Sequence, residues 1–160
     1  MRRKIFALLL AFCMIFGVVP VFNAAALDQT LPTIHVTDIS GQVGNIVTVD
    51  INLENPQDTT GFQFDLAYNS AYLEPVLVEN AQGVSVPKAD PGSIGSLLET
   101  NVTPEGTIGI ASAGTQTATG DAVQLCRLYF ELKAAGISSL QLQAAGLFNS
   151  EGDEINCSLI

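Results

Sequence analysis

The sequence is poor in the residues that most catalytic sites use. Its 160 residues include no tryptophan, three tyrosines and a single histidine, His35. It has no Gly-x-Ser-x-Gly elbow, no Walker loop and no His-Glu-x-x-His pair. Acid–base and nucleophilic catalysis depend on such groups, and glycosidases need two carboxylates facing each other across a sugar. We therefore predict a binding module with no catalytic residue, not an enzyme.

Basic residues are also scarce. Sixteen Asp and Glu oppose six Lys and Arg, which gives a formal net charge of −10. Three of the six bases lie in the first four residues, and without them the charge is about −13. A surface this acidic repels nucleic-acid phosphates and anionic lipid. We expect neither nucleic acid nor, in the mature protein, a membrane as a partner.

Metal-binding motifs are missing as well. The sequence contains no Cys-x-x-Cys and no Cys/His cluster. Asp50, Asn52 and Glu54 share the polar face of one predicted strand, which favours a solvated surface over a metal site. The acidic turn 151–154 lacks the Asp-x-Asp-x-Asp-Gly frame of an EF-hand. We expect no metal ion and no cofactor on this chain.

The N-terminal segment 1–26 has the three parts of a secretory signal peptide. Arg2, Arg3 and Lys4 precede an apolar run, and an Ala-Ala-Ala box ends at Ala26. A membrane anchor is the alternative, but Pro20 interrupts the run and the alanine box favours cleavage after Ala26. We predict a secreted protein whose single domain spans residues 27–160, located outside the cell or at its surface.

Two cysteines follow this segment, Cys126 and Cys157. Outside the cell an even number of cysteines permits a disulfide. Two buried thiols on neighbouring strands fit the sequence equally well.

No stretch after the N-terminal segment keeps a helical period for three turns. Apolar residues instead alternate with polar ones, in short runs at roughly 8 to 12 residue spacing joined by Gly, Pro and Asn turns. This pattern predicts an all-β sandwich. The predicted strands lie at residues 33–39, 47–53, 61–68, 84–86, 97–98, 107–113, 123–133, 139–143 and 155–160.

Alternation also predicts which side chains share a face. In the longest predicted strand, Cys126, Leu128 and Phe130 point one way, while Leu125 and Arg127 point the other. In the predicted strand 139–143, the apolar residues are Leu140 and Leu142.

Two predicted strands have outer faces suited to a partner. In GFQFDLAY, the apolar residues alternate with an outward amide and carboxylate, Gln63 and Asp65. In TIGIASA, the outward residues are small and include Ala111 and Ala113. Small residues let a helix lie close to a sheet, while polar neighbours supply register and specificity. A solvated strand face is the alternative interpretation.

Three segments, in order, resemble the cohesin domain of cellulosome scaffold proteins. Gly41–Asn45 with the following VTVDINLEN is similar to the glycine-bracketed turn and Val-rich strand that open a cohesin. GFQFDLAYNSAYLEPVLV is similar to the family's G-x-x-x-x-F-x-x-x-Y-D-x-x-x-L-E-x-V stretch. IGIASAGTQTATGDAVQLCRLYFELKAAG is similar to its small-residue strand, Gly/Thr loop and long alternating strand. The resemblance covers nearly all of Ile34–Ile160.

The resemblance implies a jelly-roll β-sandwich of about nine strands. Its flat face would bind a dockerin, a small helical domain that carries the calcium and belongs to a secreted enzyme. The implied partner is thus a dockerin-bearing secreted protein, a polysaccharide-degrading glycoside hydrolase that the module recruits. The family pattern puts the dockerin contacts at Gln63, Asp65, Ala111, Ala113 and Thr115.

Two other functions remain open from the sequence. Related sandwiches bind carbohydrate directly on a comparable surface, usually through exposed aromatic rings. Among the outward strand positions, only Tyr129 clearly offers such a ring. The third possibility is a structural surface or adhesion domain.

Overall fold

A computed structural model describes residues 30–136 and 138–160, and the predicted signal peptide lies outside this range. The described residues form thirteen strands, and no helix among them is long and apolar enough to cross a bilayer. The strands are β1 (Thr33–Val36), β2 (Ile46–Glu54), β3 (Gly61–Ala67), β4 (Leu73–Pro75), β5 (Leu77–Glu79), β6 (Ser85–Pro87), β7 (Ala89–Pro91), β8 (Leu97–Thr103), β9 (Thr107–Ala113), β10 (Ala122–Leu132), β11 (Gln141–Phe148), β12 (Glu154–Ile155) and β13 (Ser158–Leu159).

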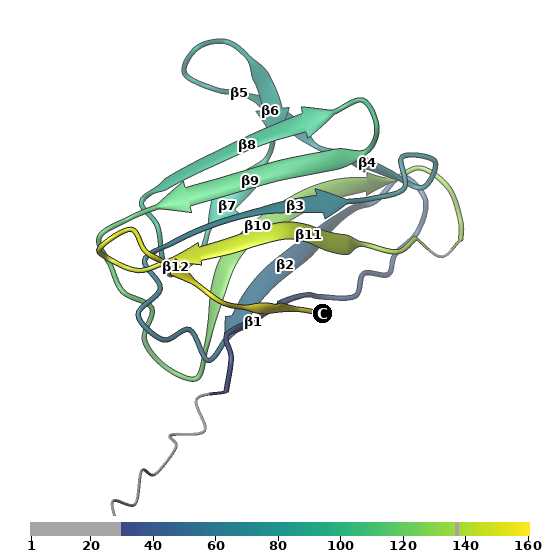
Figure 1. Ribbon diagram of the computed structural model, residues 1–160. Coiled ribbons are helices and arrows are strands. Elements are labelled where there is room, and N and C mark those ends of the chain that lie inside the picture. The colour runs from purple at the N-terminus through teal and green to yellow at the C-terminus, as the bar shows by residue number, and fades with distance from the viewer. Residues whose placement is uncertain (1–29, 137) are drawn as a thin grey trace, which may run out of the picture.

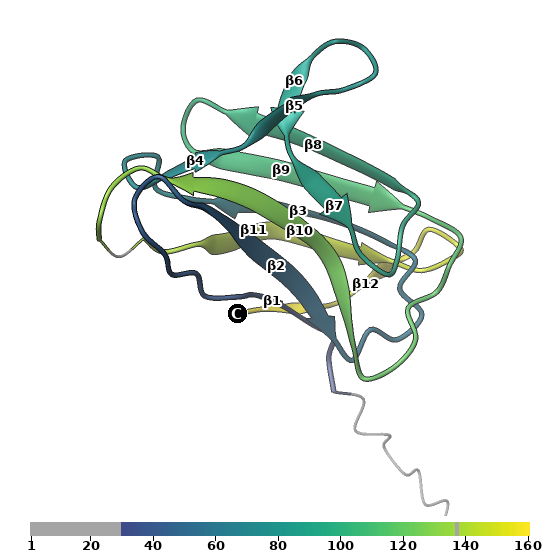
Figure 2. The ribbon, with the colours of Figure 1, turned by 180° about the vertical axis from the view of Figure 1, so that it is seen from behind.

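Two sheets pack face to face. The front sheet, nearest the viewer in Figure 1, has the order β12-β11-β3-β9-β8. The rear sheet, nearest the viewer in Figure 2, has the order β13-β1-β2-β10-β4, with β7 also paired to β10. Strands β5 and β6 form a separate hairpin that projects beyond β8 in both views.

The core lies between the two sheets and follows from the period-two alternation of the strands. In β2, alternate residues from Val49 onward are fully buried, namely Val49, Ile51 and Leu53. From the front sheet, β3 contributes its own alternate apolar residues, and Phe62 stacks on Phe64 with ring centroids 5.6 Å apart. Burial of these apolar side chains is the main force that holds the sheets together.

The predicted all-β jelly-roll sandwich is confirmed. The described residues contain thirteen strands instead of about nine because β4 to β7, β12 and β13 are pieces of two or three residues. The prediction of one last strand over 155–160 is wrong, because the structure has two short strands there. The first pairs with β11 in the front sheet and the second with β1 in the rear sheet, because the chain crosses between the layers there.

The predicted outward position of Leu125 is wrong. Gln124 lies opposite Asn52 and Cys126 lies opposite Ile51, so β10 contains one extra residue at this point. Such a β-bulge shifts the alternation by one residue. Both Leu125 and Cys126 are therefore fully buried, whereas Arg127 points outward as predicted.

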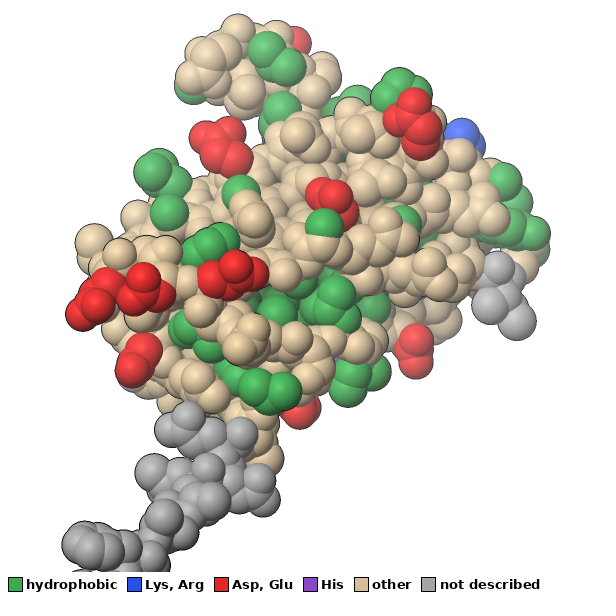
Figure 3. Space-filling view, viewed as in Figure 1, with side chains coloured by type: hydrophobic (Ala, Val, Ile, Leu, Met, Phe, Trp, Pro, Cys, Tyr) green, Lys and Arg blue, Asp and Glu red, His purple; other side chains and the backbone are tan. Residues whose placement is uncertain are grey.

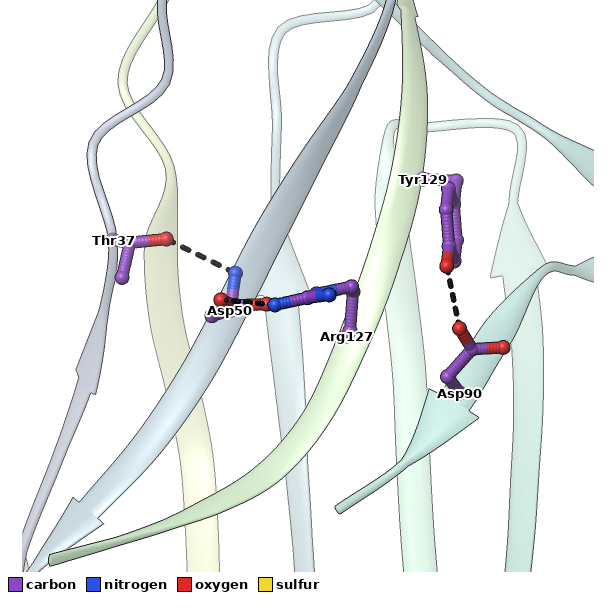
Figure 4. A network of polar contacts seen from close by, with 5 residues as sticks. All are labelled: Thr37, Asp50, Asp90, Arg127 and Tyr129. Atoms are coloured by element: carbon purple, nitrogen blue, oxygen red, sulfur yellow. Dashed lines mark hydrogen bonds and ion pairs between the residues drawn. The ribbon is translucent and has the colours of Figure 1, made fainter.

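The outer surface of the rear sheet carries a network of polar contacts (Figure 4). Arg127 donates two hydrogen bonds to the carboxylate of Asp50, of 2.6 and 2.8 Å, and the backbone N–H of Asp50 donates to Thr37 Oγ1 at 3.0 Å. The Arg127 hydrogen bond outweighs desolvation and lowers the pKa of Asp50 below its ordinary value of 3.8. Asp50 is thus occupied by an ion pair between β2 and β10.

This ion pair predicts a pH-dependent contribution to stability. Because the pKa of Asp50 is lowered in the folded state, the contribution is complete above pH 3.8 and disappears as the pH falls through the folded-state value. Thermal unfolding of Asp50→Asn and wild type should therefore differ at neutral pH and converge in acid. A difference in melting temperature that stays constant from neutral to strongly acidic pH would contradict this role.

The two cysteines of the domain are free thiols. Cys126 lies in β10, whereas Cys157 directly precedes β13, and β1 and β2 separate those strands in the sheet. Three strand spacings amount to about 14 Å, while a disulfide needs Cα atoms within about 7 Å. The disulfide is therefore excluded in this fold, and the thiols do not lie on neighbouring strands either.

Burial raises the pKa of Cys126 to about 12 and raises that of the half-buried Cys157 less. We expect a thiol reagent at neutral pH to leave Cys126 unmodified in the folded domain and to modify it on unfolding, because the thiolate is the reactive form. Mass spectrometry after alkylation, with and without denaturant, measures this. Rapid labelling of Cys126 in the native protein would contradict the burial of its side chain.

Candidate protein-binding face

The outer surface of the front sheet is built from rows of residues that lie side by side on neighbouring strands. One row runs from Glu99 through Ala111 and Gln63 to Gly146. The next row runs from Asn101 through Gly109 and Asp65 to Gln143. Because neighbouring strands are about 4.8 Å apart, each row spans about 14 Å. We call this outer surface the front face.

Small residues form the floor of the front face. Gly109 and Ala111 occupy β9, in the middle of the two rows, and a shallow open depression of about 450 Å³ lies above them. Gln63 and Asp65 line it on one side and Glu99 and Asn101 on the other. A helix backbone can approach such a floor closely, since no long side chain rises from it.

Gly109 has a specific packing role in this floor. A Cβ atom at this position would lie 2.5 Å from Asn101 Oδ1 and 3.4 Å from Asp65 Oδ1. The Asn101 side chain instead lies across the glycine and accepts a hydrogen bond of 3.2 Å from its backbone N–H. The amide group of Asn101 is therefore held on the face beside Asp65.

The charges of the described residues are divided between the two sheets. Arg127 is paired with Asp50, Lys133 lies 3.4 Å from Glu74, and Lys88 lies over the Tyr129 ring, all on the rear-sheet side. On the front face, no ion pair within the described residues reaches Asp65 or Glu99. Figure 3 shows acidic side chains scattered over this face and basic ones only at its edge. The front face therefore presents uncompensated negative charge.

Three of the five predicted contact residues, Gln63, Asp65 and Ala111, line the same depression. Ala113 is exposed one row further along β9, opposite the exposed Leu97 of β8. Thr115 is exposed in the loop that follows β9 and does not line the depression. Gln63, Asp65, Ala111 and Ala113 therefore lie on one face, and their role in binding stays a prediction.

Two residues beside the depression were missed from the sequence. Only Leu97 and Leu98 were expected to form a strand, but β8 continues to Thr103, and this brings Glu99 and Asn101 onto the front face. The sequence signal was present, since the half-buried Leu98, Thr100 and Val102 alternate with exposed residues throughout β8. It was weak because the inward positions include a threonine.

A third missed residue is Phe148. Gln143 lies opposite Asp65 and Gly146 opposite Gln63, so β11 contains one extra residue between them. Simple alternation from Leu142 would have pointed Phe148 inward. The bulge, where Ala144 has a φ of 47°, instead turns Leu147 into the core and Phe148 onto the front face.

Tyr129 is the aromatic residue that the sequence offered for sugar binding. Both its hydroxyl and its ring make contacts within the protein. Its hydroxyl donates a hydrogen bond to Asp90 (Figure 4), which raises its pKa. The ammonium of Lys88 lies 4.0 Å from the ring centroid and covers one face of the ring. This arrangement does not favour the stacking of a sugar on Tyr129.

The fold and the front face together define a jelly-roll β-sandwich that offers a flat sheet surface for binding. The family model for the Cohesin domain matches residues 32–158, and the chain therefore belongs to the cohesin family, as its sequence motifs predicted. Cohesin domains are non-catalytic binding modules. Among the described residues, no group of three or more His, Cys, Asp or Glu is placed to hold a metal ion.

Solved cohesin structures share the fold. A non-cellulosomal cohesin from the archaeon Archaeoglobus fulgidus has a TM-score of 0.66 and 19% identity, over 82% of this chain and 87% of that one. A type II cohesin from the cellulosome of Acetivibrio cellulolyticus has a TM-score of 0.65 and 22% identity, over 82% and 92%. The sixth cohesin of scaffoldin B from the same organism, solved in complex with a mutant Cel5 dockerin, has a TM-score of 0.66 and 15% identity, over 82% and 95%. No protein with a curated description matches the sequence significantly.

Proposed function

We propose that this module binds a dockerin through the front face and thereby recruits a dockerin-bearing enzyme. The observation that carries the proposal is the small-residue floor of β9, flanked by Gln63 and Asp65, on a chain of the cohesin family. The Acetivibrio cohesin of the same fold is seen in complex with a dockerin, which supports a partner of that kind.

The front face fits one side of a partner helix. An α-helix with its side chains is about 10 Å wide, and each row of the face spans about 14 Å. The helix backbone would lie over Ala111 and over the Asn101 amide that covers Gly109, where no side chain longer than asparagine intervenes. Gln63 and Asp65 beside it would hydrogen-bond polar groups of the helix, which fixes its register.

Charge sets a second condition on the partner. Since Asp65 and Glu99 lack basic partners within the described residues, a neutral or basic helix surface is favoured and an acidic one is repelled. Calcium would reside on the dockerin and not on this chain.

The wider role follows from the predicted export signal. With residues 1–26 removed, the module would act outside the cell or at its surface. The recruited partner would be a secreted enzyme, a glycoside hydrolase that degrades polysaccharide.

A double substitution tests the proposed contacts. We expect Gln63→Ala with Asp65→Ala to weaken binding to a dockerin by at least about tenfold, since two hydrogen bonds of about 1 kcal/mol each would be lost. Titration calorimetry against dockerin modules from the same genome measures the dissociation constant. Chelation of calcium should abolish binding while leaving the thermal unfolding of this module unchanged.

The rear sheet provides a matched control. Asn52→Ala with Glu54→Ala also removes an amide and a carboxylate two residues apart on an outward strand face, and it should leave the affinity unchanged. Equal loss of affinity in both double variants would argue against the front face. Binding of the module to insoluble polysaccharide, without affinity for any dockerin, would replace the proposed function with direct carbohydrate binding.

A further inference from the structure

Phe148 lies on the front face next to a predicted contact residue. A Cβ atom built on Gly146 would lie 3.2 Å from Phe148 Cζ, 3.5 Å from its Cε2 and 3.6 Å from Gln63 Cγ. The end of the phenyl ring and the Gln63 side chain therefore meet above Gly146. In the row that runs from Glu99 to Gly146, the ring occupies the place that a side chain of residue 146 would have taken.

Two glycines make room for this ring. Gly61 lies opposite Phe148 on β3, and Gly146 lies two residues before it on β11. Neither has a side chain, so the ring is laid back over the backbone of Gly146. Aromatic side chains commonly cover a glycine in this way. Phe148 is nevertheless only half-buried, and its remaining surface borders the rest of the front face.

The other aromatic side chains of the sandwich are placed differently. Phe62, Phe64 and Phe130 are buried in the core, and Tyr68 packs edge-on against Phe130. Phe148 is the one aromatic residue that the described strands place on the front face. A half-exposed ring beside a hydrogen-bonding residue and a small-residue floor has the composition of an interface centre, where aromatic anchors contribute most of the binding energy.

We propose that Phe148 is the apolar anchor of the front face and determines which partner helix fits it. The helix lies over the floor of β9 and rests one apolar side chain, a Leu, Ile or Met, against the Phe148 ring. The neighbouring Gln63 pairs with a polar side chain next to that apolar residue. This inference rests on the proposed dockerin binding and specifies the amphipathic pattern that the dockerin helix must have.

Substitution of Phe148 tests the anchor. We expect Phe148→Ala to weaken dockerin binding by about 30-fold or more, the size typical of an interface anchor. Phe148→Leu, which keeps an apolar side chain, should retain an affinity within about fivefold of the wild type. Tyr129→Ala removes an aromatic ring from the opposite sheet and should leave binding unchanged. Thermal unfolding of each variant shows whether it is folded at the temperature of the binding measurement.

If Phe148→Ala does not fold, Phe148→Lys provides a second test of the anchor. The methylene stem of lysine can cover Gly146 while its ammonium stays in water, so the sheet is preserved and the anchor is lost. We expect this variant also to lose about 30-fold or more in affinity. If a folded Phe148→Ala or Phe148→Lys binds the dockerin within about threefold of the wild type, Phe148 is not the anchor. The proposed dockerin binding is then unaffected. If the wild type itself binds no dockerin, the proposed function fails, and the anchor with it.

Discussion

The structure depends on the packing of two sheets across one apolar core. Each strand of the front sheet must point every second side chain into that core, so the outward side chains are determined at the same time. In β3, burial of Phe62, Phe64 and Leu66 forces Gln63 and Asp65 outward. A slip of one residue would bury the amide and the carboxylate and expose the phenylalanines. The core therefore holds the front face in register.

The two β-bulges change which side chains point inward and which point outward along their strands. In β10 the bulge buries both Leu125 and Cys126, which increases the apolar contribution of the rear sheet. In β11 the bulge lets Leu147 enter the core and moves Phe148 onto the front face. Bulges re-aim side chains locally without breaking the pairing of the strands on either side. The β11 bulge is consistent with a sheet that supplies both a core and the proposed binding surface, whereas the β10 bulge serves the core alone.

The two outer surfaces of the sandwich differ in how their polar groups are satisfied. On the rear sheet, Arg127 and Asp50 bind each other, and Tyr129 is engaged by Asp90 and Lys88. On the front face, Asp65 and Glu99 lie beside small residues, and no ion pair within the described part of the chain satisfies them. All the basic side chains of these contacts lie on the rear-sheet side, whereas carboxylates without a basic neighbour favour a partner that supplies donors. This difference supports the proposal that the front face is the binding surface.

The sequence by itself determined the fold class, the family and the inward or outward placement of Gln63, Asp65, Ala111 and Ala113. These features follow from local alternation and from motif order, both of which can be read along one strand. Tertiary structure alone decided the placement of Phe148, because a bulge depends on how β11 pairs with β3 and leaves no mark in the alternation pattern. It likewise decided that the two cysteines stay apart and that every described basic residue lies on the rear-sheet side. Such features depend on which strands become neighbours, and contacts between distant segments of the chain set that order.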